Sequence, residues 1–356
     1  MDVAELMGRL SEAVGISGYE TEVRSLIVDQ FREHADDVRV DPMGSVIALK
    51  RGHGPEPRRS IMLAAHLDEI GLIVTQVKEG FLQFTQVGGF DVRVLLGQPV
   101  VVHGRRTLPG VIGSRPPHVL SAADRDKVVP FDELYVDVGL PAAEVEKAVR
   151  VGDLISLRGG YRRLRGDMVA GKAFDDRAGV AALAVCLDTL SGLKHTWDAY
   201  VVATSQEEVG LRGATTSAYG VDPDLGIAID VGFGPQPGVS DVESVPIGKG
   251  PALAIGPNIH PGMLQKLEEV AKAAEIPYVV EAAPEATGTD AWAIQVAREG
   301  IPTCLLSIPV RNMHTTVETG SLKDITRTGR LLALFIAALD DRFLDEIAWP
   351  LGQPQS

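Results

Sequence analysis

The second half of the chain alternates between short apolar runs and amphipathic stretches, and this alternation limits the folds that the chain can adopt. From residue 165 onward the sequence predicts helices over 176–191, 211–219, 261–275, 290–299 and 321–340, and strands over 198–205, 225–230, 277–281 and 302–307. Alternating strand and helix segments pack as helices on both faces of a mostly parallel sheet. The pattern therefore predicts an α/β fold in which helices sandwich a mostly parallel sheet.

The first 71 residues fit the same domain. Apolar residues recur at helical spacing over 2–14 and again over 20–34, and the segment 38–52 is typical of a hairpin. A buried strand is expected over 60–65, and it ends at His66.

Residues 72–164 have a different pattern. Short β-branched runs are broken by Gly and Pro, and only the stretch 141–149 has helical spacing. Such spacing is typical of a small β-barrel or sandwich. Because helical segments dominate before and after it, we expect residues 72–164 to be a β-rich insertion into an α/β domain made of residues 1–71 and 165–356.

Composition excludes some classes of partner. The chain of 356 residues carries a formal net charge of −14. Phosphate binding needs clustered Lys and Arg, so nucleic acid is not an expected partner. The longest apolar runs, 178–187 and 331–339, are too short to span a bilayer of about 30 Å.

The two cysteines bear on whether the protein works in a reducing or an oxidising compartment. Cys186 and Cys304 both lie in apolar runs, as buried thiols do, which fits a reducing environment. The N-terminus carries acids instead of a basic start before a long apolar stretch, so no signal peptide is expected. We therefore expect a cytoplasmic protein, with the last residues, PLGQPQS (350–356), as a frayed tail.

Residues that bind metals well stand near the ends of several apolar runs. His66 closes IMLAA, Asp230 follows LGIAI, and His314 follows TCLLSIPV. Glu207 and Glu208 follow AYVVATSQ. In open α/β sheets ligands collect at the carboxyl ends of strands, so we expect these side chains to meet at one edge of the sheet.

A further acid joins this set. Asp175 stands where a loop enters a helix, a position that also suits a helix cap. Together the two imidazoles and the carboxylates suit a pair of divalent cations such as zinc, cobalt or manganese. A carboxylate shared by two metals, with an unliganded Glu beside them, is typical of a hydrolase that activates water.

The positions of neighbouring residues suggest which of them bind metal and which act as a base or orient a ligand. Glu207 and Glu208 are adjacent, so in a strand-like geometry they point apart, and one can bind metal while the other acts as a base. Asp68 stands two residues after His66 and could accept the second ring N–H of that imidazole, which would fix its tautomer.

Each residue taken alone also has an ordinary structural explanation. The HLDE segment is compatible with a surface turn, Asp230 with the start of a turn, and His314 with a core histidine. In TGTDAWA we interpret Thr289 as a helix N-cap and Asp290 as structural support in the first turn.

Beyond these arguments, the chain resembles the M42 family of metallo-aminopeptidases, the glutamyl aminopeptidase and tetrahedral (TET) aminopeptidase group. The likeness runs from the first expected helix to about residue 340 through AAHLDEIGLIV, GKAFDDRAG, SQEEVGLRGA, AIDVG, GKGPALAIGPNI, TGTDA and IPVRNMHTTVE. One departure is DVGFG, where the family more often has DVTFA.

The resemblance implies a ligand set. Asp175 would bridge two metals, His66 and Asp230 would complete one site, and Glu208 and His314 would complete the other. Of the two acids in DDR, Asp175 is preferred because relatives often carry Asn at the second position.

The resemblance also implies roles outside the ligand set. Glu207 would be the general base and Asp68 the orienting acid. Residues 72–164 would form a PDZ-like β domain used in homo-oligomer assembly, with a dimer as building block and dodecameric shells in many members.

The expected function is removal of N-terminal residues from peptides. The alternatives are an endoglucanase-type glycosidase, a related di-metal N-deacylase or carboxypeptidase, and a non-catalytic protein whose β-rich insert acts as a peptide-binding or assembly module. Arg311, near His314, would either favour Glu and Asp side chains by a bidentate pair or be a structural arginine.

Overall fold

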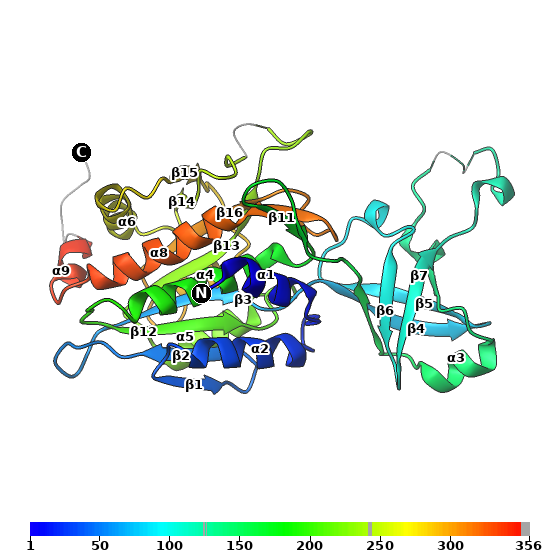
Figure 1. Ribbon diagram of the computed structural model, residues 1–356, viewed down its shortest axis with the longest axis horizontal. Helices are drawn as coiled ribbons and strands as arrows, with labels where there is room; N and C mark the ends of the chain where they lie inside the picture. The colour runs from blue at the N-terminus through cyan, green and yellow to red at the C-terminus, as the bar shows by residue number, and fades with distance from the viewer. Residues whose placement is uncertain (124, 126, 241–243, 350–356) are drawn as a thin grey trace.

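The computed structural model describes residues 1–123, 125, 127–240 and 244–349. Two parts lie side by side in Figure 1: an α/β part on the left, which contains the N-terminus of the chain, and a β-barrel on the right. The segment PLGQPQS (350–356), expected to be a frayed tail, lies outside the described residues.

One eight-stranded sheet forms the centre of the α/β part. Its strands follow the order β1 (Asp37–Val40), β2 (Val46–Lys50), β12 (Asp198–Thr204), β3 (Ser60–His66), β13 (Leu225–Phe233), β16 (Thr303–Val310), β14 (Ala252–Ile255) and β15 (Val279–Ala282). The four central strands β12, β3, β13 and β16 are parallel neighbours. Their carboxyl ends therefore meet at one edge of the sheet.

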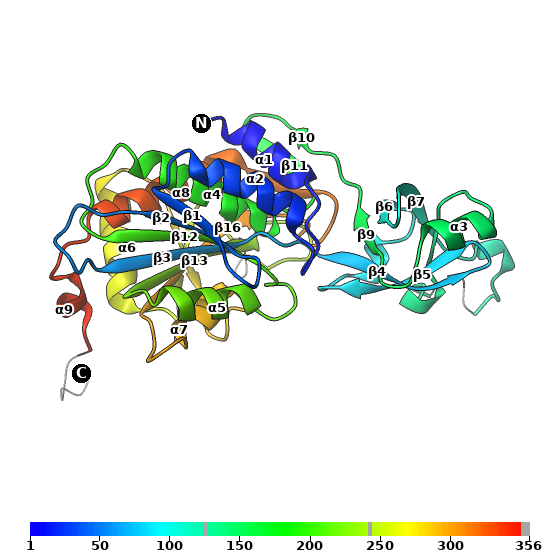
Figure 2. The ribbon, with the colours of Figure 1, turned by 90° about the horizontal axis from the view of Figure 1, so that it is seen from below.

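Helices cover both faces of this sheet, as Figure 2 shows. The helices are α1 (Val3–Glu12), α2 (Thr21–Arg32), α4 (Phe174–Leu190), α5 (Arg212–Val221), α6 (Pro261–Ala273), α7 (Asp290–Gln295), α8 (Leu322–Ala337) and α9 (Phe343–Ile347). On one face α4 packs against α8, α1 and the strands β3 and β13, while on the other face α5 and α7 pack against each other. Almost every residue of α4 is buried, since this helix is covered on all sides.

The barrel is a closed antiparallel ring. Its strands follow the order β4 (Gly71–Lys78), β5 (Phe81–Val87), β8 (Tyr135–Asp137), β7 (Thr107–Gly113), β6 (Pro99–His103) and β9 (Leu154–Leu157), with helix α3 (Ala142–Ala148) and the turns η1 (Val92–Val94), η2 (Pro117–Val119) and η3 (Phe131–Glu133) between them. Its apolar core, which includes Leu72, Val100, Val136 and Ile155, is separate from the core of the α/β part. A small sheet of β10 (Arg162–Arg163), β11 (Met168–Gly171) and β17 (Glu318–Ser321) follows the barrel.

The predicted fold class, a mostly parallel sheet between helices with an inserted β-barrel, is confirmed. Several details differ from the expectation, including the small sheet of β10, β11 and β17, which was not predicted. Strand β14 was not predicted, because it has only four residues between Gly- and Pro-rich turns. Helix α7 ends at Gln295 instead of 299, where a turn closed by Arg298 in a left-handed conformation begins. Strand β13 continues to Phe233, so Asp230 lies within the strand and not after it.

Among the helices that the described residues form, none combines the length and apolar character needed to cross a membrane. This finding agrees with the shortness of the apolar runs in the sequence.

A buried ionic cluster joins the end of β3 to α1 and α4. Lys172 Nζ lies 2.6 Å from one carboxylate oxygen of Glu69, and Arg177 Nη2 lies 3.2 Å from the other. Arg177 also donates to the main-chain carbonyls of Leu10 and Ala13. Burial by itself would raise the pKa of Glu69, but the two cations hold it below its ordinary value. The cluster therefore fixes the loop that follows His66.

Replacing Glu69 by Gln should destabilise the α/β part, because it leaves two buried cations without a counter-charge. Removing one partner of a buried pair costs about 3–5 kcal/mol. We expect a loss of that size in the free energy of unfolding measured by urea titration with far-ultraviolet circular dichroism. The exposed Glu299→Gln is the matched control and should lose less than about 0.5 kcal/mol; equal stabilities for the two variants would contradict the role given to Glu69.

Candidate active site

The structure brings the metal-type residues of the sequence together at one edge of the sheet. They come from five segments: His66 at the end of β3, Glu207 and Glu208 in the loop after β12, Asp230 in β13, Asp175 in the first turn of α4, and His314 after β16. Their ligand atoms form two groups, His66 with Asp175 and Asp230, and Asp175 with Glu208 and His314. Within each group these atoms all lie within 4.8 Å of one another.

Asp175 belongs to both groups. Its Oδ1 lies 3.0 Å from His66 Nε2, and its Oδ2 lies 3.1 Å from His314 Nε2. One carboxylate thus faces the two imidazoles with a different oxygen, which is the arrangement of a bridging ligand. Burial would raise the pKa of Asp175, but the hydrogen bonds and charges of the two imidazoles lower it below its ordinary value.

Hydrogen-bond partners fix both imidazole rings. His66 Nδ1 lies 3.2 Å from the main-chain carbonyl of Asp68 and 3.5 Å from its carboxylate. His314 Nδ1 lies 2.9 Å from the carbonyl of Gly89, in the loop after the barrel strand β5. An Nδ1–H that donates to a carbonyl leaves Nε2 as the ligand atom, and both Nε2 atoms face Asp175.

The donor set fits two divalent cations. Each group offers one imidazole nitrogen and carboxylate oxygens, which suit zinc, cobalt or manganese. Burial and the charge of Asp175 raise the pKa of Asp230 well above its ordinary value, and burial likewise raises the pKa of Glu208. Carboxylates crowded in this way gain from positive charge placed among them.

Glu207 and Glu208 approach different imidazoles. They lie in a turn after β12 and not in the strand-like geometry that the sequence predicted, because Gln206 adopts a left-handed φ of 56°. Glu207 Oε2 nevertheless lies 3.8 Å from His66 Nε2, whereas Glu208 Oε1 lies 3.4 Å from His314 Nε2. Glu207 belongs to neither ligand group.

The environment of Glu207 favours its protonated form when no other cation is near. Burial raises the pKa of Glu207 to about 10, and Asp230 and Asp290 add to the shift while His66 opposes it. A cation at the neighbouring ligand group would stabilise the carboxylate and lower the pKa of Glu207 toward neutral pH.

Asp68 holds the turn that carries these two glutamates. Its Oδ1 accepts the main-chain N–H of Glu207 at 3.0 Å, and its Oδ2 accepts that of Glu208 at 3.2 Å. The Ser17 hydroxyl donates to Oδ2 at 2.5 Å. Asp68 is fully buried and thus positions both the His66 ring and the glutamate turn.

The second acid of DDR has a different environment from the first. Asp176 Oδ1 accepts the Gly179 N–H at 3.0 Å, and its Oδ2 accepts the His66 N–H at 3.3 Å. Asp176, and not Asp175, therefore satisfies main-chain donors at the start of α4. As predicted, Thr289 caps α7 by accepting the N–H of Ala291, and the carboxylate of Asp290 accepts from Thr204.

Sequence reasoning missed Glu318. Its Oε2 accepts the N–H groups of Phe174 and Asp175, and its Oε1 accepts that of His314 at 2.8 Å. The buried carboxylate of Glu318 therefore holds the main chain at Asp175 and at His314. The only sequence signal was its place four residues after His314, at the end of the family-like segment IPVRNMHTTVE.

A pocket of about 320 Å³ opens over these residues. Besides the ligands, its lining includes Val231, Gly232, Phe233, Ala254, Glu281, Ala282, Ala283, Thr287, Gly288, Thr289, Leu305, Ser307 and Met313. Through this pocket a substrate can reach the two ligand groups from solvent.

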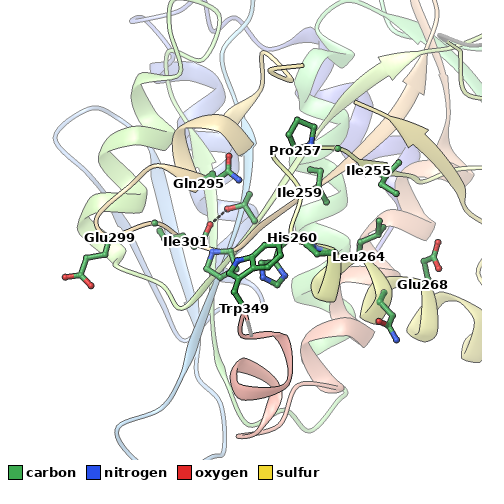
Figure 3. Close-up of a pocket in the computed structure, with 16 residues that line it drawn as sticks. Ile255, Pro257, Ile259, His260, Leu264, Glu268, Gln295, Glu299, Ile301 and Trp349 are labelled. Carbon is green, nitrogen blue, oxygen red and sulfur yellow. Dashed lines mark hydrogen bonds between the residues drawn. The ribbon is translucent and has the colours of Figure 1, made fainter. Parts of the chain in front are cut away.

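A larger cavity of about 930 Å³ lies elsewhere, where β16 begins. Figure 3 shows the rings of His260 and Trp349 next to each other at its wall, with centroids 5.2 Å apart. Strand β14 runs antiparallel to β16, so Ile255 at its end lies beside the start of β16 and away from the paired residues Asp230 and Ser307. In the part of the chain that the structure describes, neither ligand group lines this cavity.

Comparisons with known proteins agree with this fold. Residues 44–331 match the model of the M42 glutamyl aminopeptidase family. A lysyl aminopeptidase of Pyrococcus furiosus is 38% identical, over 94% of this chain and 97% of the relative. A TET aminopeptidase from a marine sediment archaeon, Thaumarchaeota archaeon SCGC AB-539-E09, superposes with a TM-score of 0.92 at 36% identity, over 97% of this chain and 99% of that chain.

A third relative is described as an assembly. The TET1 peptidase of Pyrococcus horikoshii, which can assemble into a tetrahedron or a large octahedral shell, superposes with a TM-score of 0.82 at 31% identity. The match covers 95% of this chain and 100% of that chain.

Fold, site and comparisons define a peptidase, a hydrolase acting on peptide bonds. The chain belongs to the M42 family of glutamyl aminopeptidases, whose members are dimetallic peptidases. The resemblance found in the sequence is thereby confirmed.

Metal content should follow the two ligand groups. After loading with zinc or cobalt and gel filtration, we expect two ions per chain, one for each group. His314→Ala should lose one of them, whereas Asp175→Ala should lose both, because Asp175 belongs to both groups. Inductively coupled plasma mass spectrometry measures this stoichiometry.

Asp176→Asn is the matched control for the adjacent acid, since its side chain accepts only main-chain N–H groups, and it should keep both ions. Full metal content in Asp175→Ala, or equal losses in the Asp175 and Asp176 variants, would rule out the bridge.

Proposed function

We propose that the protein is a di-metal aminopeptidase that removes N-terminal residues from peptides. The observation that carries this proposal is the Asp175 carboxylate, which faces one imidazole with each oxygen and belongs to two ligand groups. His66, Asp175 and Asp230 would hold one cation, and Asp175, Glu208 and His314 the other. Zinc or cobalt suits this mixture of imidazole and carboxylate best, and manganese is a further candidate.

The chemistry can be divided between the ions and the chain. Bound at the two groups, divalent cations would supply Lewis acidity, which lowers the pKa of water and polarises a carbonyl. Glu207 would take a proton from the attacking water on its carboxylate and would later give it to the leaving nitrogen. Asp68 keeps the glutamate turn and the His66 ring in place during both proton transfers.

The charge of the pocket supports the proposed selection of free N-termini. Glu207 lines the pocket outside both ligand groups, and its carboxylate would attract the positively charged α-amine of a peptide. An acylated N-terminus carries no such charge, so it would lose this attraction.

A glycosidase is less well supported. Its two carboxyl groups must flank the scissile bond at about 5–9.5 Å. Glu207 and Glu208 are adjacent in one turn whose main chain Asp68 holds, and this mechanism gives His66 and His314 no task. N-deacylase and carboxypeptidase activities use similar metal sites, and they are separated by the substrate test below.

The preferred N-terminal residue is not set by the names of relatives. The family is described by glutamyl and the Pyrococcus furiosus relative by lysyl aminopeptidase activity, and these side chains have opposite charges. Arg311, which the sequence suggested as a partner for acidic side chains, donates from Nε to the carbonyl of Pro235 at 2.7 Å and does not line the pocket.

Assembly is a further part of the proposal. Because the Pyrococcus horikoshii relative assembles into shells, we propose that this chain forms a homo-oligomer, built from dimers, in which residues 72–164 contribute contacts. Multi-angle light scattering distinguishes a dimer from a dodecamer. A cytoplasmic location is consistent with the two buried, free thiols of Cys186 and Cys304.

Glu207→Gln should strongly reduce turnover without loss of metal. Removing a general base costs about 100-fold to 10,000-fold in rate. We expect a fall of that size in kcat for Leu-p-nitroanilide, with the metal stoichiometry unchanged because Glu207 is outside both ligand groups. Wild-type kcat in a variant that holds its full metal content would exclude Glu207 as the base.

Substrates with free and blocked N-termini test the type of reaction. The metal-loaded enzyme should cleave Leu-p-nitroanilide and should not cleave N-acetyl-Leu-p-nitroanilide, because the blocked substrate carries no α-ammonium group. Treatment with a chelator should remove the activity, and zinc or cobalt should restore it. Cleavage of the blocked substrate alone would favour a deacylase or an endopeptidase and contradict the proposal.

A further inference from the structure

The pocket over the ligand groups extends away from them across the sheet. Its wall runs from Asp230 on β13 to Ser307 on β16, then to Ala254 on β14 and Glu281 on β15. In the register of the sheet Asp230 is paired with Ser307, and Ala254 with Glu281. The pocket therefore has the two ligand groups at one end and an acid of the last strand at the other.

Glu281 reaches back over its neighbours toward β13. A Cβ atom added to Gly232 would lie 3.6 Å from Glu281 Oε1 and 3.0 Å from Ser307 Cβ. The absence of a side chain at Gly232, together with the small residues Ala254, Ala282 and Ala283 of the lining, leaves this end of the pocket open.

The separation of the two ends matches a long side chain. Gly232 follows Asp230 by two residues on the same face of β13, and two residues of an extended strand span about 7 Å. A substrate whose α-amine lies near Asp230 would place the end of a four-carbon side chain close to the Glu281 carboxylate.

The charge of this end is one-sided. Among the described residues that line the pocket, no lysine or arginine is present, and the histidines His66 and His314 belong to the ligand groups. An acidic side chain entering here would meet Glu281 and no cation. A lysine or arginine side chain would instead form a charge-assisted hydrogen bond with it.

The surroundings of Glu281 leave its charge without a basic partner. Burial raises the pKa of Glu281, and a hydrogen bond from Ser307 opposes the shift only in part. A half-buried carboxylate satisfied by one hydroxyl gains from a cation that enters the pocket.

We propose that Glu281 is the specificity-determining residue of this enzyme and that it selects peptides whose N-terminal residue is lysine or arginine. This inference rests on the proposed aminopeptidase function and names its substrate class. Ser307 orients the carboxylate, and Gly232 leaves the passage between the ligand groups and Glu281 free.

The test compares kcat/KM for Lys-, Arg-, Leu- and Glu-p-nitroanilide on the metal-loaded enzyme. We expect the wild type to prefer Lys and Arg, with Glu the poorest substrate. In Glu281→Gln, which keeps the size of the side chain, the Lys-to-Leu ratio of kcat/KM should fall about tenfold to a hundredfold, the range for a hydrogen bond to a charged group. Glu285→Gln is the matched control: Glu285 is an exposed acid close in sequence that does not line the pocket, and the ratio should stay at the wild-type value.

A binding measurement gives a second readout that does not depend on turnover. Isothermal titration calorimetry should show tighter binding of L-lysine than of L-norleucine, which has a similar chain without the ammonium group, and Glu281→Gln should remove this difference. A wild type that cleaves Leu-p-nitroanilide without favouring Lys or Arg, or a Glu281→Gln variant with an unchanged ratio, overturns the role of Glu281 and leaves the aminopeptidase function standing. If no aminoacyl substrate is cleaved, the proposed function fails, and equal binding of the two amino acids would then overturn the role of Glu281 separately.

Discussion

The site depends on one carboxylate placed between two imidazoles. Asp175 can face His66 and His314 at the same time only if the start of α4 meets the ends of β3 and β16. Glu318 holds these segments together, because its two oxygens accept the main-chain N–H groups of Asp175 and His314. The buried cluster around Glu69 fixes the neighbouring loop in the same way. Acids that accept main-chain N–H groups thus position the acids and imidazoles of the two ligand groups.

The inserted barrel is part of this arrangement, although its apolar core is separate. The carbonyl of Gly89, after the barrel strand β5, orients the His314 ring. The neighbouring Gly88 has a left-handed φ of 78°, and a Cβ atom there would lie 2.7 Å from Ile70 and 3.3 Å from Glu208. Glycine is therefore needed for the barrel loop to approach the ligands so closely. The insertion affects the geometry of the site in addition to any part it has in assembly.

The sequence predicted the features that depend on long, uniform patterns. The central strands were found because buried parallel strands are continuous apolar runs, and their carboxyl ends located His66, Glu207 and Glu208. Strand β14 was missed because four residues between turns give no periodic signal. Glu318 was missed because its partners are main-chain N–H groups, which any sequence contains.

Asp175 and Asp176 show the same limit at the scale of one residue. They are the same residue type at adjacent positions, and sequence preference among relatives was the only ground for choosing between them. The backbone separates them: Asp175 has a non-helical ψ of 107° and faces the imidazoles, whereas Asp176 turns to the main chain of α4. Local dihedral angles of this kind are set by the packing around α4, which no pattern in the DDR segment encodes. Chemistry at strand ends can thus be predicted from residue types, but the assignment of each acid to metal, main chain or substrate requires the folded backbone.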